Sequence, residues 1–212
     1  MEHNMKKTIV DLMNKLESIN YVKSDSIPNI ELYMDQVTSF MDDQLSDSKR
    51  REEDKLLTKT MINNYTKNNL LPPPNKKKYS KDHMISLLLI YYFKNILSIN
   101  DIHAILDPIT QKYFGNKNDF DMEDIYNEIF SIEQVESKKL LKDFSKKYQV
   151  SQNSFREFPE EDQEFLHTFA FICQLSYDVY IKKMLIQKII DDVISDEDSS
   201  STSDSDSNPN TK

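Results

Sequence analysis

Glycine is almost absent from this sequence of 212 residues, in which Gly115 is the only one. Phosphate-binding loops and dinucleotide fingerprints need several glycines, because only glycine readily adopts the backbone conformations that bring amides close to a phosphate. Tight two-residue hairpin turns also favour glycine. The shortage therefore argues against nucleotide sites of these kinds and favours helix over sheet.

Cysteine is equally rare, since Cys173 is the only one. A single cysteine excludes an internal disulfide and fits a reducing compartment. Free cysteine is among the most buried residue types, so we expect Cys173 to be a small buried side chain. The first 21 residues lack the continuous apolar run of a signal peptide, and the longest apolar stretch, residues 84–93, is too short to span a bilayer. We therefore expect a cytoplasmic protein that does not insert into a membrane.

Charge is abundant but unevenly distributed. The formal net charge is -9, which argues against a chain that coats nucleic acid along its whole length. Residues 49–81 nevertheless hold only three acidic side chains against ten basic ones, which are Lys49, Arg50, Arg51, Lys55, Lys59, Lys67, Lys76, Lys77, Lys78 and Lys81. Such a basic island in an acidic chain steers anionic partners to one place.

Hydrophobic spacing predicts an all-α fold. Residues 28–45 form an amphipathic stripe with a proline near its start. Thr58 can cap a short helix that runs to about residue 68, and Asn69 stands where a left-handed residue would end it. The three prolines at 72–74 then force an extended backbone.

Four further helices complete the predicted pattern. Residues 81–96 are apolar nearly all round, which predicts the most buried element of the fold. Ser98 begins a short helix that we expect Pro108 to stop. Asp121 caps the next helix, and the longest pattern covers residues 160–194.

These elements divide the chain into four parts. We expect an N-terminal helix in residues 1–26, a helix-turn-helix domain in residues 27–108 and a C-terminal helical region in residues 120–194. Residues 195–212 are serine, aspartate and threonine with no large apolar side chain, and this composition is typical of a disordered acidic tail.

The order of parts in residues 57–106 carries most of the functional information. A short capped helix is followed by a turn, a basic loop and two helices that meet at Leu97 and Ser98. This segment resembles the DNA-binding head of the MerR family of transcription regulators, in which a recognition helix ending in tyrosine precedes a Leu-Leu-Pro-Pro turn and a basic wing ending in Tyr-Ser. The matching residues are Ile62, Tyr65, Leu70, Leu71, Pro72, Pro73, Lys77, Tyr79, Ser80, Leu87, Ile90, Leu97 and Ser98. The resemblance implies a winged helix-turn-helix head.

A second resemblance covers residues 27–106. This stretch looks still more like a bacterial family of domains of unknown function, number 1836, whose hallmark is the run TKTMINNY at residues 58–65 followed by the proline-rich basic loop. Two features depart from the MerR pattern. Asn63 stands where arginine is usual, and Asn75 alone separates Pro74 from Lys76, so the wing is short.

The residue types in this segment suit duplex DNA. Asparagine can pair with the edge of adenine through two hydrogen bonds, and lysine neutralises phosphates. If the three lysines after the prolines each met one phosphate, they would contribute a salt slope of roughly 2 to 3 log units per decade. The residues that we expect to contact DNA are Lys59, Thr60, Asn63, Asn64, Lys67, Lys76, Lys77, Lys78 and Tyr79.

No enzyme site can be read from the sequence. The four histidines (His3, His83, His103 and His167) are scattered, without the spacing of a metal site, and His83 and His103 read as satisfied or surface imidazoles. No residue spacing fits a calcium loop, and no Ser, His and acid arrangement is suggested. We expect no cofactor, no metal and no catalytic residue.

We therefore expect a DNA-binding transcription regulator. Readers of this kind commonly act as dimers, and residues 121–194 are the candidate for self-association, with Phe165, Phe169 and Phe171 in either the core or the interface. The alternative is a helical protein-interaction module without DNA binding. A small-molecule effector stays unassigned, and the acidic tail either solubilises the chain or competes with DNA for the basic island.

Overall fold

The structure is a computed structural model that describes residues 7, 11, 21–116 and 120–194. Most of the helix expected in residues 1–26 and the acidic tail from Ser195 onward thus lie outside the described residues. Within residues 21–26 the structure has only the 3-10 turn Ser24–Ser26. The remainder is mostly helical, as predicted, with one small two-stranded sheet. No helix in the described part is long and apolar enough to cross a membrane.

Helix α4 (Lys81–Phe93) is the centre of the fold. Every residue from His83 to Tyr91 is buried, which confirms that this helix is the most buried element. Both hydroxyls within that run have partners. Ser86 donates to the carbonyl of Asp82 at 2.8 Å, and the phenol of Tyr91 shares a hydrogen bond with the hydroxyl of Ser48 at 2.5 Å. The helix ends at Phe93 rather than at the predicted Ile96.

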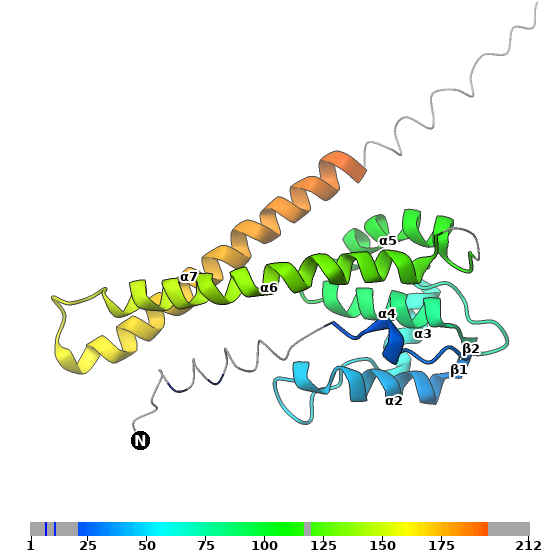
Figure 1. Ribbon diagram of the computed structural model, residues 1–212, viewed down its shortest axis with the longest axis horizontal. Helices are drawn as coiled ribbons and strands as arrows, with labels where there is room; N and C mark the ends of the chain where they lie inside the picture. Colours follow the sequence, from blue (N-terminus) through cyan, green and yellow to red (C-terminus); the bar gives the residue numbers. More distant parts are fainter. Residues whose placement is uncertain (1–6, 8–10, 12–20, 117–119, 195–212) are drawn as a thin grey trace, which may run out of the picture.

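Two short helices precede α4. Helix α2 (Met34–Gln44) buries Val37 and Met41, and α3 (Lys59–Lys67) buries Ile62 and Tyr65. Both pack on the same core as α4 (Figure 1). Residues 45–58 join them as a loop that contains the 3-10 turn Ser46–Ser48.

The ends of α3 form as the sequence predicts. Thr58 caps the start, since its hydroxyl accepts from the amide of Met61 at 3.2 Å. Asn69 ends the helix with φ at 57°. The amide of Leu70 then donates back to the carbonyl of Tyr65 at 2.9 Å. This Schellman-type ending turns the chain away from the helix and sends Leu70 into the core.

Strands β1 (Leu32–Tyr33) and β2 (Lys78–Tyr79) pair antiparallel, with Leu32 opposite Tyr79. The sheet joins the segment before α2 to the segment after the triple proline. Because β1 leads directly into α2 and β2 leads into α4, two strands of two residues are enough to fix the basic loop against the head.

The expectation that Pro108 stops a helix is wrong. Helix α5 (Ile99–Tyr113) starts at the predicted cap, where Ser98 accepts from the amide of Asp101 at 3.1 Å, but it continues through Pro108. Ile109 and Tyr113, beyond the proline, pack against the core, and this burial outweighs the missing backbone hydrogen bond. The predicted domain boundary at residue 108 therefore falls inside a helix.

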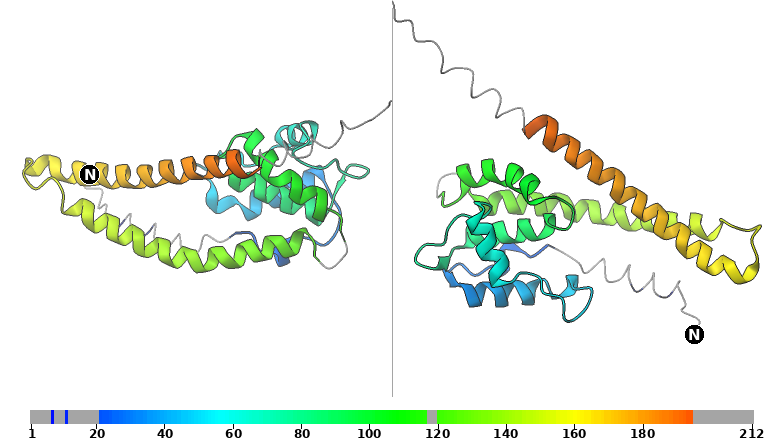
Figure 2. Two further views of the ribbon diagram at one scale, coloured as in Figure 1. Left: turned by 90° about the horizontal axis from the view of Figure 1, so that it is seen from above. Right: turned by 180° about the vertical axis from the view of Figure 1, so that it is seen from behind.

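Helices α6 (Met122–Gln152) and α7 (Glu160–Ile189) form a long antiparallel hairpin whose turn lies far from the sheet (Figures 1 and 2). Asp121 caps α6 as predicted, accepting from the amides of Glu123 and Asp124. A π-helical turn, Ile190–Ile194, follows α7, and Ile190 is buried. Cys173 is exposed on α7, so the expectation of a buried cysteine is wrong.

Two tyrosines fasten the start of the described chain to the core. The hydroxyl of Tyr92 accepts from the amide of Val22 at 3.1 Å, and the hydroxyl of Tyr126 donates to the carbonyl of Val22 at 2.6 Å. Burial raises the pKa of the Tyr126 phenol. The first turns of α6 thus belong to the same core as α4.

Removing the Tyr126 hydroxyl tests this attachment. Tyr126→Phe leaves the buried carbonyl of Val22 without its partner, and we expect the free energy of unfolding to fall by about 1–3 kcal/mol. Urea denaturation followed by circular dichroism measures the loss. Tyr177→Phe, at an exposed position of α7, is the matched control and should change nothing. Equal stability of both variants would show that the Tyr126 hydroxyl does not hold Val22 to the core.

Candidate nucleic-acid interface

Helix α3 presents a polar face to solvent. Five of the residues expected to contact DNA (Lys59, Thr60, Asn63, Asn64 and Lys67) are all exposed, while Ile62 and Tyr65 face the core. At about 100° per residue the five side chains fall within an arc of roughly 140°. In the described part of the chain, no hydrogen bond or ion pair engages the side chains of Asn63, Asn64 or Lys67.

The basic loop is a tight hairpin. Asn75 pairs with Lys78 across the turn, and the amide of Lys78 donates to the carbonyl of Asn75 at 2.9 Å. Lys76 and Lys77, the two central residues, have φ of 48° and 67°. Positive φ at both central positions defines a type I′ turn, which strongly favours asparagine followed by glycine. The two lysine side chains are exposed at its tip.

Lysine is a poor residue for either position. A left-handed backbone costs a residue with a Cβ roughly 1–2 kcal/mol. Two adjacent lysines in this conformation thus carry strain that Asn-Gly would relieve. Backbone strain of this kind clusters at functional sites, where side-chain chemistry matters more than stability.

Two ion pairs connect α3 and the hairpin to the start of α2 and the segment before it. Lys59, at the start of α3, pairs with Asp35. Lys78 lies 3.7 Å from Glu31, with its ammonium 5.6 Å from the centre of the Tyr33 ring. The start of α3 and the base of the hairpin are therefore brought to the same end of α2, as Figure 1 shows for the strands.

Tyr79 does not share this surface. Its side chain is only 3% exposed, because in β2 it points inward opposite Leu32 and packs edge-on against the ring of His83. The sequence placed Tyr79 among the contact residues because it directly follows the lysines. Side chains alternate across a strand, so the neighbour of half-exposed Lys78 faces the core. Tyr79 leaves the candidate interface and becomes a core residue.

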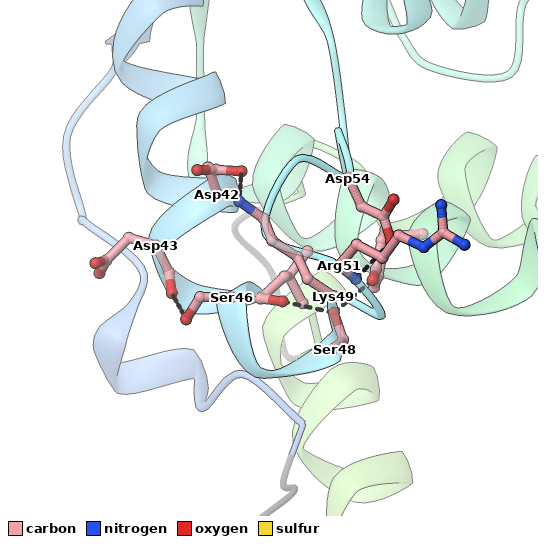
Figure 3. A network of polar contacts seen from close by, with 9 residues as sticks. Asp42, Asp43, Ser46, Ser48, Lys49, Arg51 and Asp54 are labelled. Carbon is pink, nitrogen blue, oxygen red and sulfur yellow. Dashed lines mark hydrogen bonds and ion pairs between the residues drawn. The ribbon is translucent and has the colours of Figure 1, made fainter.

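The basic island is less charged than its sequence suggests. Four of its ten basic residues (Lys49, Lys59, Lys78 and Lys81) pair with acids that lie outside residues 49–81. Figure 3 shows one such case, in which Lys49, in the loop after α2, pairs with Asp42 of α2. The ammonium and the carboxylate are 2.8 Å apart. Sequence counting misses these acids because they come from other elements.

Six basic side chains of the island remain without an ion pair in the described part of the chain, namely Arg50, Arg51, Lys55, Lys67, Lys76 and Lys77. In Figure 3 the guanidinium of Arg51 points away from the labelled acids, while its backbone amide donates to Asp54 at 3.0 Å. Arg50, Arg51 and Lys55 sit in the loop between α2 and α3 and were not among the expected contact residues. In the sequence only their positive charge indicated that these three residues could contact DNA.

His83 lies beneath the hairpin. Its Nδ1 accepts from the amide of Ser80 at 3.0 Å, and its ring packs edge-on against Phe114. The Nε2 atom is buried and has no hydrogen-bond partner of good geometry among the described residues. Burial lowers the pKa of this imidazole, although the nearby carbonyl of Pro73 and the carboxylate of Asp82 act in the opposite direction.

The comparison with protein families gives one result. Residues 22–129 match the family described as "Domain of unknown function (DUF1836)". The matched range begins at the tyrosine-held Val22 and ends in the first turns of α6, so it follows the compact head closely. No curated protein and no solved structure matches the chain.

The buried imidazole predicts a pH dependence of stability. Because the pKa of His83 is lower in the folded chain, the unfolded chain binds the proton first as the pH falls below about 6.5. The folded state therefore loses stability below that pH, by at most about 1.4 kcal/mol per pH unit. Melting temperatures between pH 7.5 and 5.5 should fall less steeply in His83→Gln than in the unsubstituted chain. Identical pH profiles would contradict a neutral buried His83.

Proposed function

The chain belongs to the DUF1836 family, and we propose that it is a transcription regulator that binds duplex DNA through α3 and the lysine hairpin. The observation that carries the proposal is the strained pair Lys76 and Lys77, on a hairpin whose base lies at the same end of α2 as the start of α3. The side chains of Asn63, Asn64 and Lys67 on α3 have no partner in the described part of the chain. The lysine hairpin alone, or the polar face of α3 alone, would be an ordinary solvent-exposed surface. Together they match the two tasks of a DNA reader, which are gripping the backbone and reading base edges.

Helix α3 has the size and chemistry for a major groove. Its nine residues span about 13 Å, and the groove is about 12 Å wide. Asn63 and Asn64 supply the donor and acceptor pair that matches adenine, while Lys67 supplies a phosphate contact. The adjacent exposure of both asparagines supports base reading.

The hairpin supplies the sequence-independent grip. Lys76 and Lys77 have no ion pair in the described part of the chain, whereas Lys78 is partly neutralised by Glu31. Two free lysines correspond to a salt slope of about 2 log units per decade. Lys67 adds to the positive field around them, whereas Arg50, Arg51 and Lys55 are offset by Glu52, Glu53 and Asp54 of the same loop.

We further propose that the head is a winged helix-turn-helix like that of the MerR family. The order β1, α2, α3, hairpin, α4 and α5 supports this likeness. One feature differs, because α2 and α3 are joined by residues 45–58 rather than by a turn of three or four residues. In this proposal that loop, with Arg50 and Arg51, lies over the DNA backbone beside α3.

A protein-interaction module is the second candidate function. Ile30, Tyr33 and Met61 expose apolar surface beside the same lysines, and such a mixture also suits a protein partner. A pull-down separates the two functions. A stoichiometric protein partner that survives nuclease treatment would favour the interaction module, and nuclease-sensitive recovery would favour DNA.

Replacing the strained lysines separates folding from binding. Lys76→Asn with Lys77→Gly installs the residues that a type I′ turn prefers, so we expect stability to rise by about 1–2 kcal/mol. The same variant loses two phosphate contacts, so its affinity for a duplex should fall about tenfold or more at 0.1 M salt, with a salt slope smaller by about 2. Thermal melting and fluorescence anisotropy measure the two effects.

The matched control removes equal charge elsewhere. Lys142→Ala with Lys146→Ala acts at two exposed positions of α6 and should leave the affinity for DNA unchanged. Equal weakening by both double variants would mean that net charge alone drives binding. Unchanged binding by the hairpin variant would contradict the proposed grip.

The asparagines should govern sequence preference. Asn63→Ala and Asn64→Ala remove base contacts but no charge, so we expect specific binding to weaken by about 1–3 kcal/mol per site while non-specific binding and the salt slope stay the same. Binding-site selection from random duplexes, followed by anisotropy on selected and scrambled sites, measures this. A uniform loss on both duplexes would argue against base reading.

A further inference from the structure

Helix α7 leaves an unusual amount of apolar surface open. No residue of this 30-residue helix is buried. Phe165 is 72% exposed, Phe169 is 50% exposed and Tyr180 is 58% exposed. Ile172 and Met184 are also at least half exposed. Of the two alternatives for the phenylalanines of α7, core or interface, the core is therefore excluded for Phe165 and Phe169, which stack on each other in solvent.

These side chains share the face that points away from α6. The opposite face holds the contacts with α6, in which Gln174 donates to the carbonyl of Lys147 and Asp178 pairs with the ammonium of Lys147 at 2.6 Å. At about 100° per residue, Phe165, Phe169, Tyr180 and Met184 lie together on the free side, and Cys173 lies among them. The second half of α7 also diverges from α6, so α6 does not cover this face (Figures 1 and 2).

The open area suits a protein interface. With about 200 Å² for a fully exposed aromatic residue, Phe165, Phe169 and Tyr180 leave roughly 350 Å² open in one copy and roughly 700 Å² in two. Ile172 and Met184 extend it towards the roughly 1,200 Å² at which specific interfaces begin. The largest apolar patch of a monomer is often functional, and this patch reaches that class.

The charges on the same face indicate what covers it. The helix begins with acids, Glu160, Glu161 and Asp162, and its last turns carry Lys182, Lys183 and Lys188. Asp162 and Lys183 lie on the free side, at opposite ends of the apolar stripe, and both are exposed. Two antiparallel copies of α7 would bring the acid of each copy to the lysine of the other, whereas parallel copies would bring like charges together.

We propose that α7 pairs with α7 of a second copy of this chain in an antiparallel homodimer whose two-fold axis passes near Cys173. Cys173 lies eleven residues after Asp162 and ten before Lys183, so it marks the midpoint of the charge pattern. In the register that sets Asp162 opposite Lys183, Phe165 of one copy lies opposite Tyr180 of the other, and both side chains are on the free side. Such an interface is self-complementary, as a closed dimer requires. The inference does not depend on DNA binding.

The first test is the dimer itself. Light scattering of the full chain over micromolar concentrations should give the mass of two copies. Phe169→Ala removes one ring from each side and should raise the dissociation constant about 100-fold or more. Phe120→Ala removes a ring that is 67% exposed just before α6, away from this face, and should leave the dimer intact. A monomer throughout, or equal effects of the two variants, would overturn the proposal.

The second test is the direction of pairing. In a Cys173→Ser background, Asp162→Cys and Lys183→Cys are prepared separately and treated with a short thiol cross-linker. Antiparallel pairing predicts cross-linking when the two proteins are mixed and none in either alone. Cross-linking within each protein alone, with no product in the mixture that joins the two variants, would show parallel pairing and overturn the register.

The exposed charges give a test that leaves the fold untouched. Asp162→Lys places like charges together and should weaken the dimer. Asp162→Lys with Lys183→Asp restores opposite charges across an antiparallel interface and should recover the original dissociation constant. Failure of the double variant to recover, in a protein with an unchanged circular dichroism spectrum, would contradict the proposed contact.

Discussion

Burial of α4 is the constraint on which the head depends. Its unbroken buried stretch from His83 to Tyr91 needs apolar cover on every side, and α2, α3, α5 and the start of α6 provide it. Full burial of each large side chain contributes roughly 1.5–3 kcal/mol. Because cover comes from several elements, α3 has to commit only Ile62 and Tyr65 to the core. The rest of its surface is free for polar chemistry.

The two surfaces proposed to bind partners both contain locally unfavourable features, one in the backbone and the other in the side chains. At the hairpin, Lys76 and Lys77 adopt a backbone conformation that lysine disfavours, and the charge they present accounts for the cost. On α7, Phe165 and Phe169 stand in water, where apolar side chains are unfavourable until a partner covers them. Both features are confined to the surface, so they leave the packing of the core around α4 unchanged. A dimer through α7 would also present two heads to one duplex, as two-fold symmetric DNA sites require.

Features that depend on near neighbours could be predicted from the sequence. The caps at Thr58 and Asp121, the left-handed Asn69 and the burial of α4 are confirmed because spacing and side-chain type decide them. Features that depend on distant partners could not. Pro108 stays inside α5 because residues beyond it reach the core, and the paired lysines lose charge to acids far away in sequence. The burial of Tyr79 follows from its place in a two-residue strand, which the sequence pattern does not reveal. The exposure of Cys173 follows from its position on the side of α7 that no other described helix covers.

The central claim is that one surface, made of α3 and the hairpin tip, meets DNA. Backbone amide NMR spectra of the full chain, recorded as a short duplex is added at low salt, test it residue by residue. The account predicts the largest shifts at Lys59–Lys67 and at Asn75, Lys76 and Lys77, with α7 unchanged. No shifts at saturating duplex, or shifts confined to α7, would contradict it.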